Sequence, residues 1–285
     1  MSSSVTLREG PLARLGRGRQ SRRGSACAAT VACVAGRDEI ITFLDSLLDA
    51  PSFADHCPNG LQVPGAPEVG VLATGVSAHR ELFERAAAEG AQMVLCHHGL
   101  FWEGDPRAIS TRLKGRLRTL FDADMSLAAY HLPLDAHPDV GNNALICSAL
   151  GLTRAEPFGT HRGREIGWVG RSREGIPAAE LRARCGTAFG REPLVFGGSA
   201  EPVRSVGVVS GGGASSLAEA AERGLDALVT GEPAEPSMAD AREAGVHFIA
   251  GGHYGTETFG VRRVGDLLAE RFGVRHTFIE VRNPV

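Results

Sequence analysis

The sequence predicts an α/β fold made of two similar halves, each a mixed sheet flanked by helices, with the halves related by a pseudo-twofold axis. Three observations predict this fold. Short apolar segments of strand length alternate with amphipathic segments of helical spacing. The alternation in the first part of the chain is repeated in the second. Polar residues follow the ends of the apolar segments, where open α/β sheets place their ligands.

The composition limits the class of protein. With 285 residues, 43% hydrophobic and 22% charged, the chain is long enough to bury a substantial core. The net charge of -3 gives no general attraction to nucleic acid or anionic membranes. The six cysteines are scattered without a C-x-x-C pair, which argues against a disulfide framework and fits a reducing compartment. We therefore expect a cytoplasmic protein that binds neither membrane nor nucleic acid.

Residues 1–36 differ from the rest of the chain, because arginines stand among Ser, Gly and Ala and are followed by a mildly apolar run over 26–36. We expect a disordered, basic extension. A secretory or twin-arginine signal is the less favoured interpretation, since the run lacks leucine and ends without a clear cleavage site. The predicted folded domain covers residues 37–285, with a first half over about 37–152 and a second over about 153–285.

In the first half, hydrophobic spacing predicts a helix that begins near Asp38 and is ended by Pro51. The polar segment 55–62 follows as a loop, and His56 and Cys57 are assigned to this loop because no further ligand lies near them in sequence. Strands and helices then alternate. These predicted elements are a strand over 69–74, a helix over 78–89, a strand over 93–96, a helix over 113–122, a strand over 125–130 and a helix over 142–150.

His97 and His98 directly follow the buried strand over 93–96. Inside a strand, neighbouring side chains point to opposite faces. At a strand end, where the backbone turns, both rings can point into one small volume. Two imidazoles in that position suit a pair of metal ions.

The second half repeats the first. The strand, helix and strand that lead to His97-His98 recur before Gly231-Glu232, so Glu232 occupies the place of His98. A later strand in each half ends in a histidine that is followed four residues on by a carboxylate and then by a helix. These two pairs are His131 with Asp135, and His253 with Glu257. A surface i, i+4 pair is the less favoured interpretation of the second pair.

A pseudo-twofold axis brings both sets of strand ends into one cleft. The candidate ligands there are His97, His98, His131, Asp135, His253 and Glu257. Imidazole and carboxylate without thiolate suit zinc, iron, manganese, cobalt or nickel, and a carboxylate can bridge two ions. Structural zinc sites are usually closed and rich in cysteine, so this set indicates an open, catalytic centre.

Several roles stay open at this stage. His131 is either a ligand or a group that orients a ligand or moves protons. Glu232 is the candidate general acid or base, with a simple turn carboxylate as the alternative. His137 either belongs to a polar loop or lines the cleft, and His161 is assigned no role. The glycines 211–213 are expected to form a turn near the cleft, since the G-K-[ST] of a P-loop is absent.

Ordered motifs along residues 37–285 resemble the Nif-three-like family, whose members are also labelled GTP cyclohydrolase 1 type 2 homologues. The matching motifs are Asn59-Gly-Leu-Gln, Cys96-His-His-Gly-Leu-Phe-Trp102, Tyr130-His-Leu-Pro-Leu-Asp-Ala-His137, Gly231-Glu232 and Gly252-His253-x-x-x-Glu257. The resemblance implies a two-lobed fold, a homohexameric ring and a dinuclear centre held by His97, His98, Asp135, His253 and Glu257, with His131 close by. The chain departs from the family at 236–239, where Pro-Ser-Met-Ala stands in a region that often contains a histidine.

The function expected from these residues is that of a metal-dependent hydrolase with two divalent metal ions per chain. Glu232 or His131 would move protons. The family label suggests a purine nucleotide as the small-molecule substrate, and a phosphoester or another cyclic amidine is equally open. The alternative is a non-enzymatic metal-handling or scaffold ring that acts through protein partners. Turnover that is lost with Glu232→Ala while metal stays bound would distinguish the enzyme from the binder.

Overall fold

The computed structural model describes Met1 and residues 33–285, so the expected extension over 1–36 lies almost wholly outside the described residues. Within them, β1 (Ala35–Gly36) pairs antiparallel with β3 (Glu68–Val69). The folded region therefore includes two residues that the sequence analysis placed in the extension. In the described part of the chain, no helix is long and apolar enough to cross a membrane.

The first sheet has five strands in the order β13-β4-β5-β6-β2. The first four are parallel and β2 runs antiparallel to β6. The apolar runs of the central strands explain their position, because a parallel strand covered on both faces needs apolar residues throughout. The bounds are β2 (Gly60–Val63), β4 (Val71–Ser77), β5 (Met93–His98), β6 (Ser126–Ala129) and β13 (Arg275–Phe278).

The second sheet has six strands in the order β7-β8-β10-β11-β12-β9. Its centre is formed by the three parallel strands β10, β11 and β12, which are flanked by antiparallel ones. The hairpin β7–β8 was not predicted from the sequence. The bounds are β7 (Thr153–His161), β8 (Arg164–Ile176), β9 (Leu194–Phe196), β10 (Val203–Val209), β11 (Ala227–Thr230) and β12 (His247–Ala250).

Helices connect the parallel strands in the same way in both sheets. In the first sheet α2 (Arg80–Ala88) and α3 (Thr111–Asp122) join β4, β5 and β6. In the second, α7 (Ser216–Glu222) and α8 (Ser237–Ala244) join β10, β11 and β12. The mixed α/β fold with helix-flanked sheets is as predicted, and the matching connections are consistent with the internal repeat.

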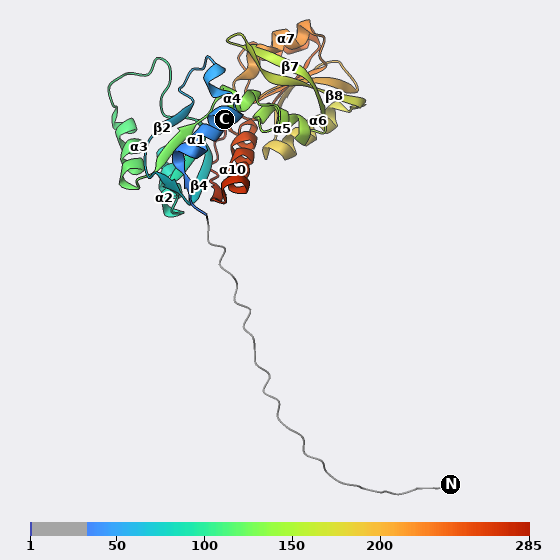
Figure 1. Ribbon diagram of the computed structural model, residues 1–285. Coiled ribbons are helices and arrows are strands. Elements are labelled where there is room, and N and C mark those ends of the chain that lie inside the picture. Colours follow the sequence, from blue (N-terminus) through green and yellow to red (C-terminus); the bar gives the residue numbers. More distant parts are fainter. Residues whose placement is uncertain (2–32) are drawn as a thin grey trace. The chain divides into compact units, whose positions relative to one another are not determined.

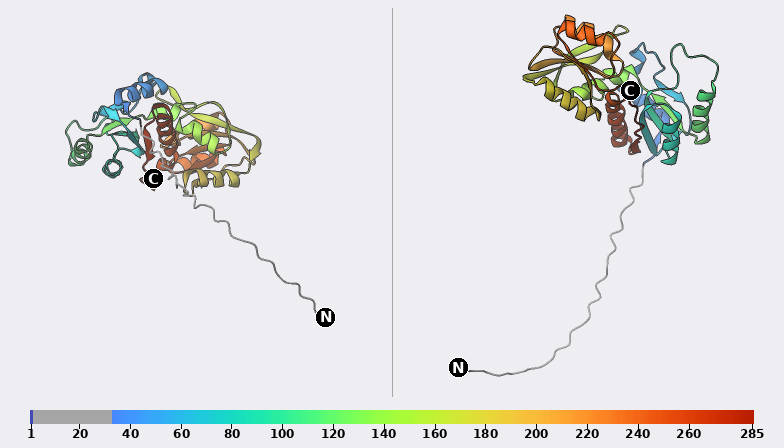
Figure 2. Two further views of the ribbon diagram at one scale, coloured as in Figure 1. Left: turned by 60° about the horizontal axis from the view of Figure 1, so that its bottom comes forward. Right: turned by 180° about the vertical axis from the view of Figure 1, so that it is seen from behind.

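The two sheets are tied together by helices that cross between them. Helix α10 (Thr258–Phe272) follows β12 of the second sheet but packs against β4 and β13 of the first. Helix α5 (Asn142–Ala149) follows the first sheet's β6 but packs against β8 and β10. Figure 1 shows α10 beside β4 and α5 beside β8, and in Figure 2 the red helix again lies between the two sheets. Each lobe is therefore completed by a helix from the other half of the sequence.

The remaining helices cover the sheets or carry site residues. Helix α1 (Arg37–Leu47) ends before the short turn η1 (Ala50–Ser52), close to where Pro51 was expected to end it. Helix α6 (Ala178–Phe189) contributes Leu181 and Cys185 to the core of the second lobe. Two short helices that were not predicted, α4 (Leu132–Ala136) and α9 (His253–Thr256), follow the third parallel strand of each sheet.

Candidate metal centre

The six candidate ligands from the sequence lie together where the parallel strands of both sheets end. Glu257 is central to this cluster, with its Oε1 3.1 Å from His253 Nε2 and 3.5 Å from His97 Nε2. Its Oε2 lies 3.2 Å from His98 Nε2. Asp135 Oδ2 approaches His97 Nε2 to 3.4 Å from the other side. The ring of the sixth candidate, His131, is 5.0 Å from that of His97, centroid to centroid.

Strand β5 lasts two residues longer than predicted and includes both histidines. Their rings are nevertheless only 4.7 Å apart, centroid to centroid. The first ring is fully buried and the second is 18% exposed. Both rings therefore lie close together, as expected. They do so while the strand is still paired to β4, since His98 pairs with Ser77.

Each of the four imidazoles of the cluster is held through Nδ1, which leaves Nε2 for the centre. This pattern of a protein acceptor on one nitrogen and a free second nitrogen is typical of metal-binding histidines. The four contacts are His97 to the Tyr130 carbonyl (3.0 Å), His98 to Ser77 Oγ (3.0 Å), His131 to Asp55 Oδ1 (2.7 Å) and His253 to Glu232 Oε1 (3.2 Å).

Two buried polar atoms of the cluster lack any hydrogen-bond partner among the described residues, namely His97 Nε2 and Glu257 Oε2. The carbonyl of Tyr130 can only accept, so Nδ1 of His97 carries its proton and Nε2 presents a lone pair when the ring is neutral. A lone pair facing two buried carboxylates is repulsive, and burying unpaired charge is costly. A cation between these atoms satisfies all of them, so the residues fit a metal site.

The pKa directions indicate the same need for positive charge. Burial opposes the charged form of His97, but Asp135 and Glu257 raise its pKa well above the usual value. Burial also lowers the pKa of His253, but Glu257 and Glu232 outweigh burial and raise this pKa to about 9. Although burial favours the neutral acid, the neighbouring histidines hold the pKa of Glu257 well below its usual range. In the absence of metal, protons on His97 and His253 therefore supply part of the positive charge that the cations would bring.

Asp135 is held in place by groups that the sequence analysis did not assign. Its Oδ1 accepts from Asn142 Nδ2 at 2.8 Å and from Ser210 Oγ at 2.9 Å, which leaves Oδ2 to face His97. The other end of Asn142 accepts from the backbone nitrogen of Gly260 at 2.7 Å, at the start of α10. This amide therefore joins the metal centre to the helix that ties the two lobes together.

A glycine turn lies against the cluster, as expected for residues 211–213. Gly211 has a φ of +59°, and a Cβ there would lie 2.2 Å from Glu257 Oε1 and 3.1 Å from His253 Nε2. Gly231 is similarly confined, since its Cβ would lie 2.6 Å from the carbonyl oxygen of Gly211. Only glycine lets these two backbone segments approach the ligands so closely.

With this geometry in view, comparisons with known proteins identify the family. The model of the Duf34/NIF3 (NGG1p interacting factor 3) family matches residues 35–284. The chain belongs to this family.

Relatives in the Duf34/NIF3 family cover nearly the whole folded region. A Pseudomonas aeruginosa protein named GTP cyclohydrolase 1 type 2 homolog is 41% identical over 240 residues, which is 84% of this chain and 95% of the relative. The solved structure of protein ybgI, described as of unknown function, shares 36% identity with a TM-score of 0.83, covering 88% of this chain and 100% of its own. TTHA1606 from Thermus thermophilus shares 36% identity with a TM-score of 0.80, again over 88% and 100%.

Asp55 is the main residue of the centre that the sequence analysis missed. It was placed in a polar loop, yet besides His131 it accepts from the backbone nitrogens of His56 (2.6 Å) and Leu132 (3.0 Å) and from Asn59 Nδ2 (3.0 Å). With these acceptor sites filled, Asp55 holds His131 in orientation. The spacing Asp55-x-x-x-Asn59 ahead of a glycine turn is the one signal in the sequence that could have indicated it.

Cys57 lies beside Asp55 and His131, and the three groups come close enough to resemble a further metal site. Burial, together with the negative charges of Asp55 and Asp135, raises the pKa of the Cys57 thiol to about 12, so it stays protonated. A protonated thiol is a poor metal ligand. The sequence interpretation of Cys57 as a loop residue without a ligand role stays a prediction.

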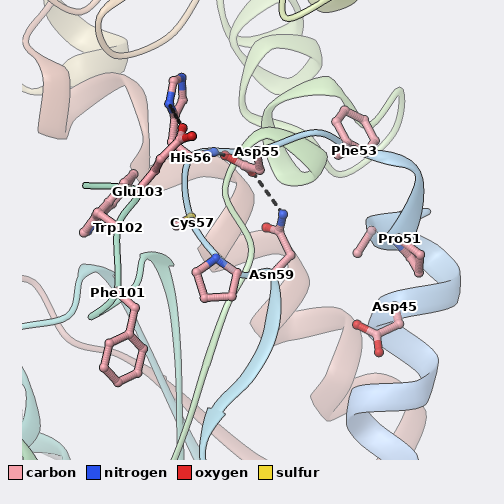
Figure 3. Close-up of a pocket in the computed structure, with 12 residues that line it drawn as sticks. Asp45, Pro51, Phe53, Asp55, His56, Cys57, Asn59, Phe101, Trp102 and Glu103 are labelled. Atoms are coloured by element: carbon pink, nitrogen blue, oxygen red, sulfur yellow. Dashed lines mark hydrogen bonds and ion pairs between the residues drawn. The ribbon is translucent and has the colours of Figure 1, made fainter. Parts of the chain in front are cut away.

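Two hollows adjoin the centre and share His56 in their walls. A cavity of about 210 Å³ is lined by His131, Asp135, His253 and Glu257 on the metal side. A wider one of about 630 Å³ is lined by the 55–59 segment itself. Figure 3 shows this second hollow, with Trp102 and Glu103 on one wall and Phe53 on the opposite one.

The structure corrects the interpretation of His161 and decides between the two alternatives for His137. His161 does not stand alone, because its Nε2 is 2.9 Å from His56 Nε2 and its ring lines the smaller cavity. His137 does not line the metal cleft. Its Nδ1 accepts from the backbone nitrogens of Asp139 and Val140, and the side chain borders a separate cavity of about 330 Å³. The alternative that placed His137 in a polar turn is the right one.

Proposed function

We propose that this Duf34/NIF3 protein binds two divalent metal ions and acts as a metal-dependent hydrolase. The observation that carries the proposal is the pair of buried atoms that make no hydrogen bond, His97 Nε2 and Glu257 Oε2, at the centre of a cluster of imidazoles and carboxylates. Nitrogen and oxygen donors without thiolate suit zinc, iron, manganese, cobalt or nickel. The five residues that would hold the ions are His97, His98, Asp135, His253 and Glu257.

Bound divalent ions would supply Lewis-acid chemistry, lowering the pKa of water toward about 7 and stabilising negative charge in a displacement. The chain's own residues fix the geometry. Asn142 and Ser210 orient Asp135, and Asp55 orients His131. Such preorganised holders keep the ligands in place without rearrangement during the reaction.

Glu232 is suited to move a proton. Its Oε1 lies 3.2 Å from Nδ1 of the candidate ligand His253, and its side chain is 39% exposed, so it contacts both that ligand and solvent. A carboxylate in this position can take a proton at its second oxygen from an attacking water and return it to a leaving group. His131 is the second candidate, although its Nδ1 is engaged by Asp55.

The substrate class proposed is a nucleotide or a phosphoester. The relatives' name, GTP cyclohydrolase 1 type 2 homolog, supports a nucleotide. The cavity beside the metal centre, at about 210 Å³, supports binding of a small reacting group whose remainder lies outside.

We also propose that the chain assembles as a homohexamer in the cytoplasm, as the family resemblance implies. Light scattering coupled to gel filtration measures the mass directly. A mass six times the chain's 30.0 kDa supports the hexamer, and a monomeric mass in the metal-loaded state contradicts it.

The test of the proposed function is elemental analysis of the purified protein beside Asp135→Ala and His253→Ala. We expect about two metals per chain in the wild type and a loss in both variants, because each removes a ligand from the cluster. One metal or none in folded, metal-supplied wild type would overturn the paired centre. Two metals without turnover on nucleotides or phosphoesters would favour the non-enzymatic metal handler.

A further inference from the structure

The tip of the β7–β8 hairpin reaches from the second lobe to the loops of the first and closes one side of the smaller cavity. Arg162 at this tip donates to His56 Nδ1 at 2.8 Å and forms an ion pair with Glu103. Arg164 donates to the Ser52 carbonyl oxygen at 2.9 Å. These contacts hold the hairpin tip, and with it His161, in the cavity wall.

The arginine determines which nitrogen of each histidine carries a proton. A guanidinium can only donate, so His56 Nδ1 is an acceptor and the proton of its neutral ring is on Nε2. That proton is donated across 2.9 Å to His161 Nε2. The neutral ring of His161 therefore carries its own proton on Nδ1, for which residues 33–285 supply no acceptor.

The rest of this wall also offers donors. The hydroxyls of Ser215 and Ser216 line the cavity, and neither makes a hydrogen bond to another described residue. The carboxylates that line the cavity are Asp135 and Glu257, and both belong to the metal cluster. Away from the metal ligands, this cavity presents hydrogen-bond donors and no carboxylate.

We propose that His161 Nδ1–H, with Ser215 and Ser216, forms a subsite for the phosphoryl group of a phosphoester substrate. A phosphoryl group offers several acceptor oxygens, which match the imidazole N–H and the two hydroxyl donors. The cavity volume of about 210 Å³ also suits a phosphoryl group better than a whole nucleotide. The inference rests on the proposed function and narrows its substrate class.

The test uses inorganic phosphate as the probe and manganese-loaded full-length protein, with binding measured by isothermal titration calorimetry. His161→Asn places an amide nitrogen near the position of Nδ1, while His161→Gln places one near Nε2. A subsite donor predicts that Asn keeps phosphate affinity within about threefold of wild type. It also predicts that Gln and His161→Ala weaken affinity about tenfold or more, since hydrogen bonds to charged acceptors are strong.

Metal content and thermal midpoint of each variant are measured alongside, so that any loss of affinity is compared at equal metal loading. The proposal is overturned if His161→Gln binds phosphate as tightly as wild type, because the residue would then serve only to contact His56. It is also overturned if His161→Asn binds as weakly as His161→Ala, or if metal-loaded wild type binds no phosphate.

The two proposals fail in different ways. Phosphate binding with the expected Asn and Gln pattern, but without hydrolysis of any phosphoester, would remove the hydrolase and leave the subsite. Hydrolysis of a phosphoester with unchanged phosphate affinity in His161→Gln would remove the subsite and leave the hydrolase.

Discussion

Glu257→Gln removes the negative charge at the middle of the metal centre while keeping the size of the side chain. The carboxylate oxygens lie within 3.5 Å of three imidazole nitrogens, those of His97, His98 and His253. A carboxylate here can serve both proposed ions, whereas an amide offers one neutral oxygen. We therefore expect Glu257→Gln to hold at most one metal per chain.

The expected magnitude follows from linkage between binding and folding. A metal present at 100 times its dissociation constant stabilises the folded state by about 2.7 kcal/mol. In a chain of this size, each kcal/mol shifts the unfolding midpoint by about 2–4 °C. Two ions thus separate the metal-loaded wild type from the chelated wild type by about 11–22 °C, and Glu257→Gln should show half of that separation or less.

The assay is thermal unfolding with manganese or with chelator, paired with elemental analysis. Glu243→Gln, an exposed carboxylate in α8, is the control for loss of a charge away from the centre. It should keep two metals and the full separation of midpoints. Two metals and an unchanged separation in Glu257→Gln would refute the bridging role assigned to this carboxylate.

Three further predictions follow from the same centre. Glu232→Gln should keep the metals, because an amide oxygen still accepts from His253. Turnover should fall by about 10²–10⁴-fold, because the amide cannot carry a proton. Kinetics measured beside elemental analysis will check this, and unchanged turnover would exclude Glu232 as the proton carrier. Since Glu257 and Glu232 outweigh burial and raise the pKa of His253 to about 9, metal uptake at pH 7 must displace a proton. Metal affinity should therefore rise with pH up to about 9, and the binding heat should differ between buffers of different ionisation enthalpy, whereas equal heats would contradict the reasoning. Gly211→Ala should lose metal, because its Cβ would meet Glu257. The control Gly224→Ala, at a similar φ of +63° with nothing within 4 Å, should show only the backbone strain of a left-handed residue and keep its metals. Equal metal content in the two variants would show that the close contact is unimportant.

Most of the candidate metal site was predictable from the sequence, because its residues follow strand ends in a repeated order. His131 with Asp135, and His253 with Glu257, stand at the same distance after corresponding strands. Parallel strands bring their carboxyl ends to one edge of a sheet, so a local pattern was enough to group them. The α/β class was predictable for the same reason, since apolar runs and amphipathic spacing are local properties.

The partners of those ligands were not predictable, because they come from loops and from the opposite lobe. Asp55 reaches His131 across 76 positions of sequence, and Ser210 reaches Asp135 across 75. A hydrogen bond of this kind leaves no periodic trace in the chain.

The contacts between the lobes were likewise decided only by the tertiary structure. Helix α10 packs on the first sheet although its sequence belongs to the second half, and His161 meets His56 across 105 positions. Sequence by itself determined the α/β class, most of the central strands and helices, and the group of residues that the structure brings together, since these depend on neighbours a few residues apart. Packing of the two lobes decided which nitrogen His56 and His161 present and which groups close the cavity, since these depend on residues brought together only by folding.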